Sequence, residues 1–239
     1  MSSSHDSSLV ARVAALWRYP VKSMAAEALN EADVSWQGIA GDRRWAFVRP
    51  NLEQSGFPWL TLRQRADMNA YRPAFTDPAN PDTSPTRVRT PTGAVLDVTD
   101  PALAAELDGA RIIRQKRGIF DAFPLALITT QTIAQLSDLV GMPLDPQRFR
   151  PNILIDAHDD TPFPEDAWVG RTVRIGGMRM RIDKRDGRCV VITIDPATGE
   201  RRPEILKTVA DHRQGCLGVY GSIVTPGRVV LGDEVVLEQ

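Results

Sequence analysis

The chain has 239 residues, of which 42% are hydrophobic and 25% charged. This composition is typical of a globular protein with one large domain or two small ones, and it excludes collagen, a coiled coil and wholesale disorder. The 29 Lys and Arg residues balance the 30 Asp and Glu residues to a formal charge of -1. No overall field therefore attracts nucleic acid or an anionic membrane, and any anion site must be local.

The sequence predicts a cytoplasmic protein without a membrane span. No apolar stretch approaches the roughly 18 residues that a span requires, and the opening MSSSHDSS lacks the apolar run of a secretory signal. Residues 1–8 are polar and Ser-rich, so we expect a disordered leader. Cys189 and Cys216 are too few for a disulfide scaffold and are expected to be free thiols.

Short strands are predicted for the first half of the chain, because apolar residues alternate there between turn signals. Asp100 followed by Pro101 indicates the start of a short helix over 101–107. A hairpin is expected to turn at residues 91–93. The predicted strands cover 9–17, 28–36, 44–48, 59–62 and 110–115.

The second half combines two predicted helices with many strands. Ile133, Leu136 and Val140 form one stripe of a helix over 130–140, and Gly141 is a stop signal. A second helix is expected over 203–212. Strands are predicted at 149–156, 168–175, 178–183, 189–195, 217–224, 228–231 and 234–237. Such a density of short strands favours a β-barrel with one or two attached helices.

Cys189 is the most suggestive single residue. It follows Lys184, Arg185 and Arg188, and nearby cations favour the thiolate, which attacks electrophiles and binds soft metals. The alternative is a small buried cysteine of a strand, because free cysteines are among the most buried residues. Cys216 has no such cationic neighbours and is interpreted as structural. Motifs of zinc sites, serine hydrolases and nucleotide-binding loops are absent from the sequence.

Four short clusters combine cations with hydroxyl or amide donors at places where a strand is expected to meet a loop. They lie at 19–23, 42–45, 129–132 and 148–152. The planar Arg fork suits phosphate, and Ser, Thr and Asn add smaller donors. Taken singly, each cluster also fits an exposed surface, where Lys and Arg are most often found.

Taken together and in this order, five segments resemble the MOSC proteins, and within them the mitochondrial amidoxime-reducing component family. The segments are LWRYPVKSM, GDRRWAFV, RFRPNILID, FPEDAWVGRTVRIGG and GRCVVITIDPATGE. The resemblance implies a molybdenum cofactor, in which a phosphorylated pterin dithiolene and one protein cysteine hold the metal. Cys189 matches the position of that cysteine and would be both metal ligand and catalytic residue.

The resemblance also implies which residues hold the pterin and its phosphate. Lys22, Ser23, Arg43, Arg150 and Asn152 match motif positions with this role. Further candidates are Thr129 and Thr132, which stand where relatives commonly have serine, and the adjacent Arg148 and Arg188.

The implied fold is a β-rich α+β protein, in which a MOSC β-barrel with peripheral helices accompanies an N-terminal β domain. We expect a MOSC N-terminal β-barrel-like domain over 9–120 and the MOSC domain over 121–239, with the cofactor between them. The segment Asp195 to Gly199 belongs to the family pattern, but its residues predict a turn.

The implied activity is reduction of N-hydroxylated compounds, such as amidoximes, hydroxylamines or N-hydroxylated bases, to amines or imines and water. No ferredoxin-type cysteine spacing occurs, so an external donor protein of ferredoxin, flavodoxin or cytochrome b5 type is expected. No nucleic-acid partner and no pyridoxal phosphate are expected. Two alternatives remain open: sulfur transfer through a persulfide on Cys189, and a cofactor carrier without turnover.

Overall fold

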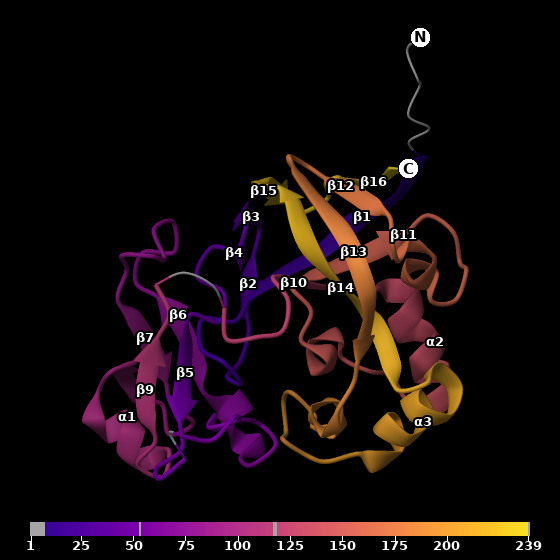
Figure 1. Cartoon of the computed structure of the whole chain (residues 1–239). Helices are drawn as coiled ribbons and strands as arrows, with labels where there is room; N and C mark the ends of the chain where they lie inside the picture. The colour runs from indigo at the N-terminus through magenta and orange to yellow at the C-terminus, as the bar shows by residue number, and fades with distance from the viewer. Residues whose placement is uncertain (1–7, 53, 117–118, 239) are drawn as a thin grey trace.

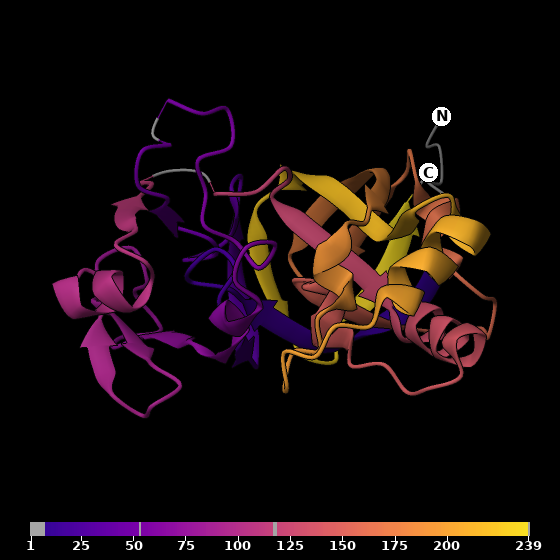
Figure 2. The ribbon, with the colours of Figure 1, turned by 90° about the horizontal axis from the view of Figure 1, so that it is seen from below.

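The computed structural model describes residues 8–52, 54–116 and 119–238. Figure 1 shows a β-rich chain in two lobes, with α2 and α3 beside the barrel lobe and α1 in the N-terminal lobe. Seen from below in Figure 2, the two lobes lie side by side. The α+β, β-rich fold class is therefore confirmed.

A closed barrel of seven strands forms the larger lobe. The strands follow one another around the barrel, and the pairing of β1 with β11 closes it. A short eighth strand, β2, extends the same sheet beside β1. The order is β11 (Ile153–Ala157), β10 (Leu125–Thr129), β14 (Cys216–Thr225), β13 (Met178–Gly187), β12 (Thr172–Ile175), β16 (Glu234–Glu238), β1 (Ser8–Arg18) and β2 (Glu27–Leu29).

Strand β1 shows how the sequence pattern fills the barrel. Ala11, Val13 and Leu16 belong to the barrel core, because alternate side chains of a strand lie on the same face. An irregularity of register between Val13 and Ala15 changes the spacing from two residues to three. Beyond it, Trp17 packs outside the barrel with the helices.

The helices α2 (Thr130–Val140) and α3 (Pro203–Arg213) cover the outside of the barrel and share a second core. Their apolar residues, among them Leu136 and Val209, are buried in that core. Gly141 ends α2 at a φ of 76°, a left-handed conformation that glycine adopts without a steric penalty. Both predicted helices are confirmed within a residue.

The N-terminal lobe contains two small sheets around a third core, and a further small sheet, of residues 31–35, 38–39 and 227–230, packs against the barrel core. As predicted, Asp100 caps the helix α1 (Pro101–Glu106) by accepting from the Ala102 N–H. The sheets consist of β15 (Gly227–Val230), β3 (Glu31–Ser35) and β4 (Gly38–Ile39); of β5 (Trp45–Val48) and β9 (Arg111–Arg114); and of β6 (Arg72–Phe75), β7 (Thr86–Arg89) and β8 (Val95–Asp97).

Two predicted strands were wrong. Residues 59–62 form no strand, and Trp59 makes only an isolated bridge with Val48. Residues 189–195 contain a 3₁₀ helix at Val190–Thr193, because the short apolar run is buried on successive rather than alternate residues.

The two predicted domain segments exchange strands. β1 and β2 belong to the sheet that contains β10 to β14 and β16, while β15 pairs with β3. The boundary at residue 120 stays a prediction, and the packing units do not divide there. The predicted leader 1–8 lies outside the described residues except for Ser8, which already begins β1. None of the described helices has the length and apolar character needed to span a bilayer.

Candidate functional site

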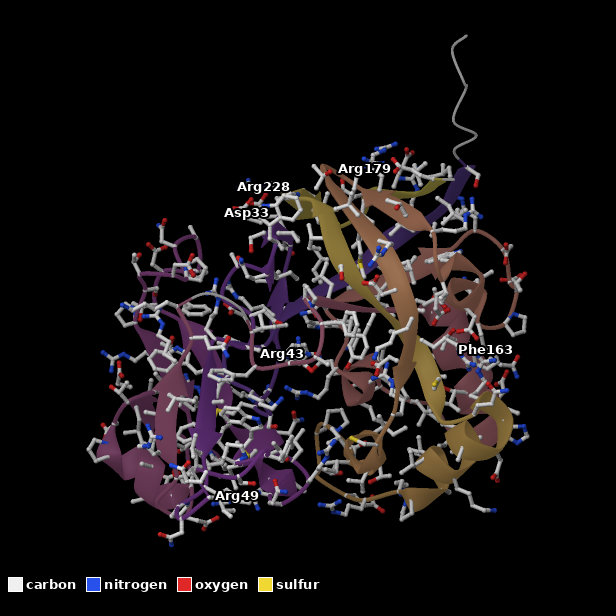
Figure 3. All side chains as sticks on the ribbon, viewed as in Figure 1. Asp33, Arg43, Arg49, Phe163, Arg179 and Arg228 are labelled. Carbon is white, nitrogen blue, oxygen red and sulfur yellow. The ribbon has the colours of Figure 1, made fainter. Side chains whose placement is uncertain are left out.

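A cavity of about 620 Å³ lies where the two lobes meet. Six residues that the sequence analysis selected line this cavity: Lys22, Ser23, Arg43, Arg150, Arg188 and Cys189. They come from chain segments more than 160 residues apart, so only the folded chain brings them together. Figure 3 shows Arg43 in the space between the lobes.

Cys189 follows the end of β13 and directly precedes the 3₁₀ helix Val190–Thr193. Two backbone hydrogen bonds fix its position: the Arg188 N–H donates to the Gly215 carbonyl at 2.8 Å, and the Ile192 N–H donates to the Cys189 carbonyl at 3.1 Å. The side chain is half-buried and lines the cavity. The thiol is therefore accessible to a ligand, and the buried-cysteine alternative does not apply.

The cavity has a positive lining although the whole chain is nearly neutral. Two carboxylates, Asp121 and Asp186, face six basic side chains. The six are Lys22, Arg43, Arg63, Arg150, Lys184 and Arg188. This excess of cations suits an anionic ligand.

Arg43 is neutralised by its own neighbours. Its Nη1 lies 2.6 Å from Asp42 Oδ2 and its Nε lies 2.8 Å from Asp121 Oδ2. Burial lowers the pKa of Arg43, but the two carboxylates outweigh this effect and raise it overall. Arg43 therefore contributes order to the site more than free positive charge.

Arg150 has the opposite environment. Its guanidinium lies over the Tyr19 ring, 4.3 Å from the centroid, and its Nη1 donates to Asn69 Oδ1 at 3.3 Å. Its Nη2 is buried without a hydrogen-bond partner among the described residues. Burial lowers the pKa of Arg150 to about 10, with only partial compensation by Tyr19. A residue that lines the cavity thus carries a buried N–H with no acceptor among the described residues.

Lys22 and Ser23 enter the cavity on the loop after β1. The Lys22 ammonium donates to the Phe120 carbonyl at 2.6 Å. Burial lowers the pKa of Lys22, against the opposing effect of Asp121. Ser23 is buried and has a φ of 70°, a left-handed conformation that is uncommon for a residue with a side chain.

Arg188 is held by two hydrogen bonds and one ion pair. It donates to the carbonyls of Leu217 and Phe149 at 2.7 and 2.8 Å. Its Nη1 also lies 2.8 Å from Asp186 Oδ2. Burial raises the pKa of Asp186, although Arg188 opposes this shift. The sequence analysis missed Asp186 and its cavity neighbour Tyr220, because neither belongs to a cluster with a recognisable spacing.

Thr129 and Thr132 do not line the cavity but hold a buried carboxylate. Both hydroxyls donate to Glu165 Oε2 at 2.7 Å. The Thr129 side chain also caps α2 by accepting from the Thr132 N–H. The two threonines thereby fix the start of α2 to the segment that contains Glu165.

Arg148 and Asn152 also lie outside the cavity lining, although both contact residues close to it. Arg148 donates to the Thr193 carbonyl at 3.1 Å and pairs with Asp195 at 2.8 Å, which anchors the segment after Cys189. Asn152 is fully buried, and its Oδ1 accepts from Arg43 Nη1 at 3.2 Å. Their contacts give both residues a positioning role.

The N-terminal lobe supplies cavity residues that the sequence analysis did not select. Phe57, Trp59, Thr61 and Arg63 lie on one loop, and Phe120 lies on another. Aromatic and apolar residues in loops carry no spacing signal. Only the fold shows that they share a cavity with Cys189.

Comparisons with known proteins agree with this arrangement. The model of the MOSC domain family matches residues 114–236, and that of the MOSC N-terminal beta barrel domain matches residues 10–122. The crystal structure of the YUAD protein from Bacillus subtilis has the same fold, with a TM-score of 0.54, 13% identity and 98% coverage of both chains.

Curated relatives include molybdenum cofactor sulfurases and mitochondrial amidoxime-reducing components. The chain is 25% identical to molybdenum cofactor sulfurase of Drosophila mojavensis over 84% of this chain and 30% of the relative. It is 28% identical to mitochondrial amidoxime-reducing component 1 of Homo sapiens over 49% of this chain and 37% of the relative. It is 23% identical to mitochondrial amidoxime-reducing component 1 of Mus musculus over 95% of this chain and 82% of the relative. The chain thus spans about a third of the first relatives, and it belongs to the MOSC domain family.

Proposed function

We propose that this protein binds a molybdenum cofactor in the cavity between its lobes and reduces N-hydroxylated compounds. The observation that carries the proposal is the half-buried thiol of Cys189 in a cavity of about 620 Å³ with six basic side chains. A thiolate is a soft metal ligand, and clustered cations suit a phosphate group. The relatives named amidoxime-reducing component and molybdenum cofactor sulfurase support the same cofactor.

The residues present fit such a cofactor. The donor set provides one accessible thiol for the metal. The buried Nη2 of Arg150 lacks an acceptor among the described residues, and a phosphate or pterin oxygen would supply one. Lys22, Arg188 and Ser23 would add donors from neighbouring segments of the lining.

The reaction needs two electrons and two protons for each N–O bond that breaks. An amidoxime R–C(=NOH)NH2 takes up the two electrons and the two protons and yields the amidine R–C(=NH)NH2 and water. When bound, the cofactor supplies two-electron redox chemistry at the metal. The electrons would come from an external redox protein of ferredoxin, flavodoxin or cytochrome b5 type.

The protein itself would bind and orient the cofactor and would neutralise its negative charge. Cys189 would hold the metal, and Arg150 would bind the anionic part of the cofactor. Arg43 would keep the loop of Lys22 and Ser23 in place through Asp42 and Asp121. Asn152 and Arg148 would position Arg43 and the Cys189 segment, respectively.

Two other functions use the same thiol or the same cations. A persulfide on Cys189 would transfer sulfur without a metal, as the name of the sulfurase relatives suggests. A carrier would bind the cofactor through the cations without turnover.

The test is expression in a host that makes the cofactor, followed by molybdenum and pterin analysis. Turnover of benzamidoxime with an artificial electron donor is then measured for the wild type and for Cys189→Ser. We expect about one molybdenum per chain, and turnover in the wild type only. Full cofactor content without turnover would favour the carrier, and a metal-free protein with a persulfide would favour sulfur transfer.

A further inference from the structure

Aromatic side chains are concentrated in the candidate cavity. They make up 6% of the chain, yet Phe57, Trp59, Phe120 and Tyr220 all line this one cavity. Three of the four come from the N-terminal part of the chain and are here called the aromatic wall: Phe57, Trp59 and Phe120. Cys189 and Tyr220 reach the cavity from the barrel lobe.

The aromatic wall is held in place without a ligand. Trp59 bridges to Val48 through the backbone, and its ring packs on Phe120 with centroids 5.0 Å apart and a tilt of 59°. The Arg63 guanidinium lies over the Phe57 ring, 5.1 Å from the centroid. Rings fixed in this way lose little conformational freedom when a flat group stacks on them.

The outer part of the aromatic wall opens to solvent. Phe57 is 39% exposed and Arg63 is exposed, whereas Phe120 is buried at the inner end of the wall. A tightly held cofactor is expected where Cys189 and the unpartnered Arg150 Nη2 lie. A substrate must exchange with solvent, and the exposed end of the wall is where it can do so.

We infer that the aromatic wall binds the ring of a flat aromatic N-hydroxylated substrate, and that Phe57 and Trp59 make the protein selective for aromatic over aliphatic substrates. This inference rests on the proposed function. It assigns the wall to the substrate and not to the pterin. Phe57 and Trp59 would act on substrate binding, and neither would be needed to hold the metal.

The test compares benzamidoxime with acetamidoxime, which has a methyl group in place of the ring. Loaded wild type, Trp59→Leu and Phe57→Leu are measured with the same artificial donor. Leucine keeps an apolar side chain at the position but removes the flat ring. Trp36→Leu is the matched control, because Trp36 is 59% exposed and does not line the cavity.

For both wall variants we expect kcat/KM with benzamidoxime to fall at least fivefold, mainly through KM, because a stacking contact is lost. The value with acetamidoxime should stay within twofold, as should molybdenum and pterin content. The Trp36→Leu control should match the wild type. An equal loss for both substrates, or no loss in either variant, would overturn the inference. Loss of cofactor from Trp59→Leu would also overturn it, by assigning the wall to the pterin.

A binding measurement separates this inference from the proposed function. Calorimetry with benzamidine and acetamidine, the two reaction products, requires no turnover. We expect benzamidine to bind at least fivefold more tightly than acetamidine to the wild type, and this difference to shrink in Phe57→Leu. Selective binding without any turnover would refute the reductase but keep the aromatic wall. Turnover without a difference in affinity between benzamidine and acetamidine would refute the role of the aromatic wall but not the proposed function.

Discussion

Replacing Arg150 by methionine tests the electrostatic reasoning about the cavity most directly. The substitution keeps a long side chain for packing on Tyr19 and removes a guanidinium whose Nη2 is buried without an acceptor. If an anionic oxygen of the cofactor accepts from this N–H, the variant loses a charged hydrogen bond of about 1.5–3 kcal/mol. That energy corresponds to a loss of about 10- to 150-fold in cofactor affinity.

The empty protein should respond differently from the loaded one. Methionine can still pack on Tyr19 but gives up the cation–π contact with its ring, worth about 0.5–2 kcal/mol, and the 3.3 Å hydrogen bond to Asn69. It also removes a buried cation whose pKa is already lowered to about 10. Because these effects oppose each other, we expect the free energy of unfolding of the empty protein to change by no more than about 1 kcal/mol.

The assay is the ratio of molybdenum and pterin to protein during prolonged dialysis, with urea unfolding of the empty protein in parallel. Arg87→Met is the matched control, since Arg87 is exposed on β7 and does not line the cavity. Cofactor loss that is no faster than in this control would refute the assignment of Arg150 as an anion donor.

Three further outcomes are expected. The free energy of unfolding of Cys189→Ser should lie within about 0.5 kcal/mol of the wild-type value, but the variant should lose molybdenum and turnover. Wild-type activity in this variant would refute the role of Cys189 as a metal ligand. Thr132→Val removes one of the two hydroxyls on Glu165 Oε2 and should cost about 1–3 kcal/mol in urea unfolding. The cofactor content of Thr132→Val should be unchanged, because Thr132 lies outside the cavity lining. Loss of cofactor without loss of stability would show that Thr132 takes part in cofactor binding. Burial raises the pKa of Glu165 despite its hydrogen bonds, so its contribution to stability is present at low pH and is lost as the pH rises through the folded-state pKa. Glu165→Gln should remove this decline from plots of unfolding free energy against pH from 4 to 8, and an unchanged slope would contradict the burial effect.

Much of the fold follows from local patterns in the sequence. The alternating residues of β1 and the periodic stripe of α2 are regular enough to define both elements. The Asp100 cap defines the start of α1. The run 189–195 was misleading, because a short apolar stretch fits a strand and a buried 3₁₀ helix equally well. The strand Leu125–Thr129 was missed because it is buried along its whole length and shows no alternation.

The candidate site was only partly predictable from the sequence. The family resemblance selected Cys189, Arg150 and four more residues that line the cavity. It did not distinguish them from Asn152 and Arg148, which hold their neighbours in place, because lining and supporting residues share the same motif. The aromatic wall gave no signal at all, since stacking partners such as Trp59 and Phe120 meet only after folding.

The position of β1 between β11 and β16 has a consequence for assembly during synthesis. The ring of strands stays open until residues 234–238 have left the ribosome, because β16 must pair with both β1 and β12. Contacts so distant along the chain form slowly. Lys22 and Ser23 follow β1 closely, so the loop that carries them into the cavity acquires its final support at the same late stage. The proposed cofactor would therefore bind at this crevice only after β16 has been made and has paired with β1 and β12.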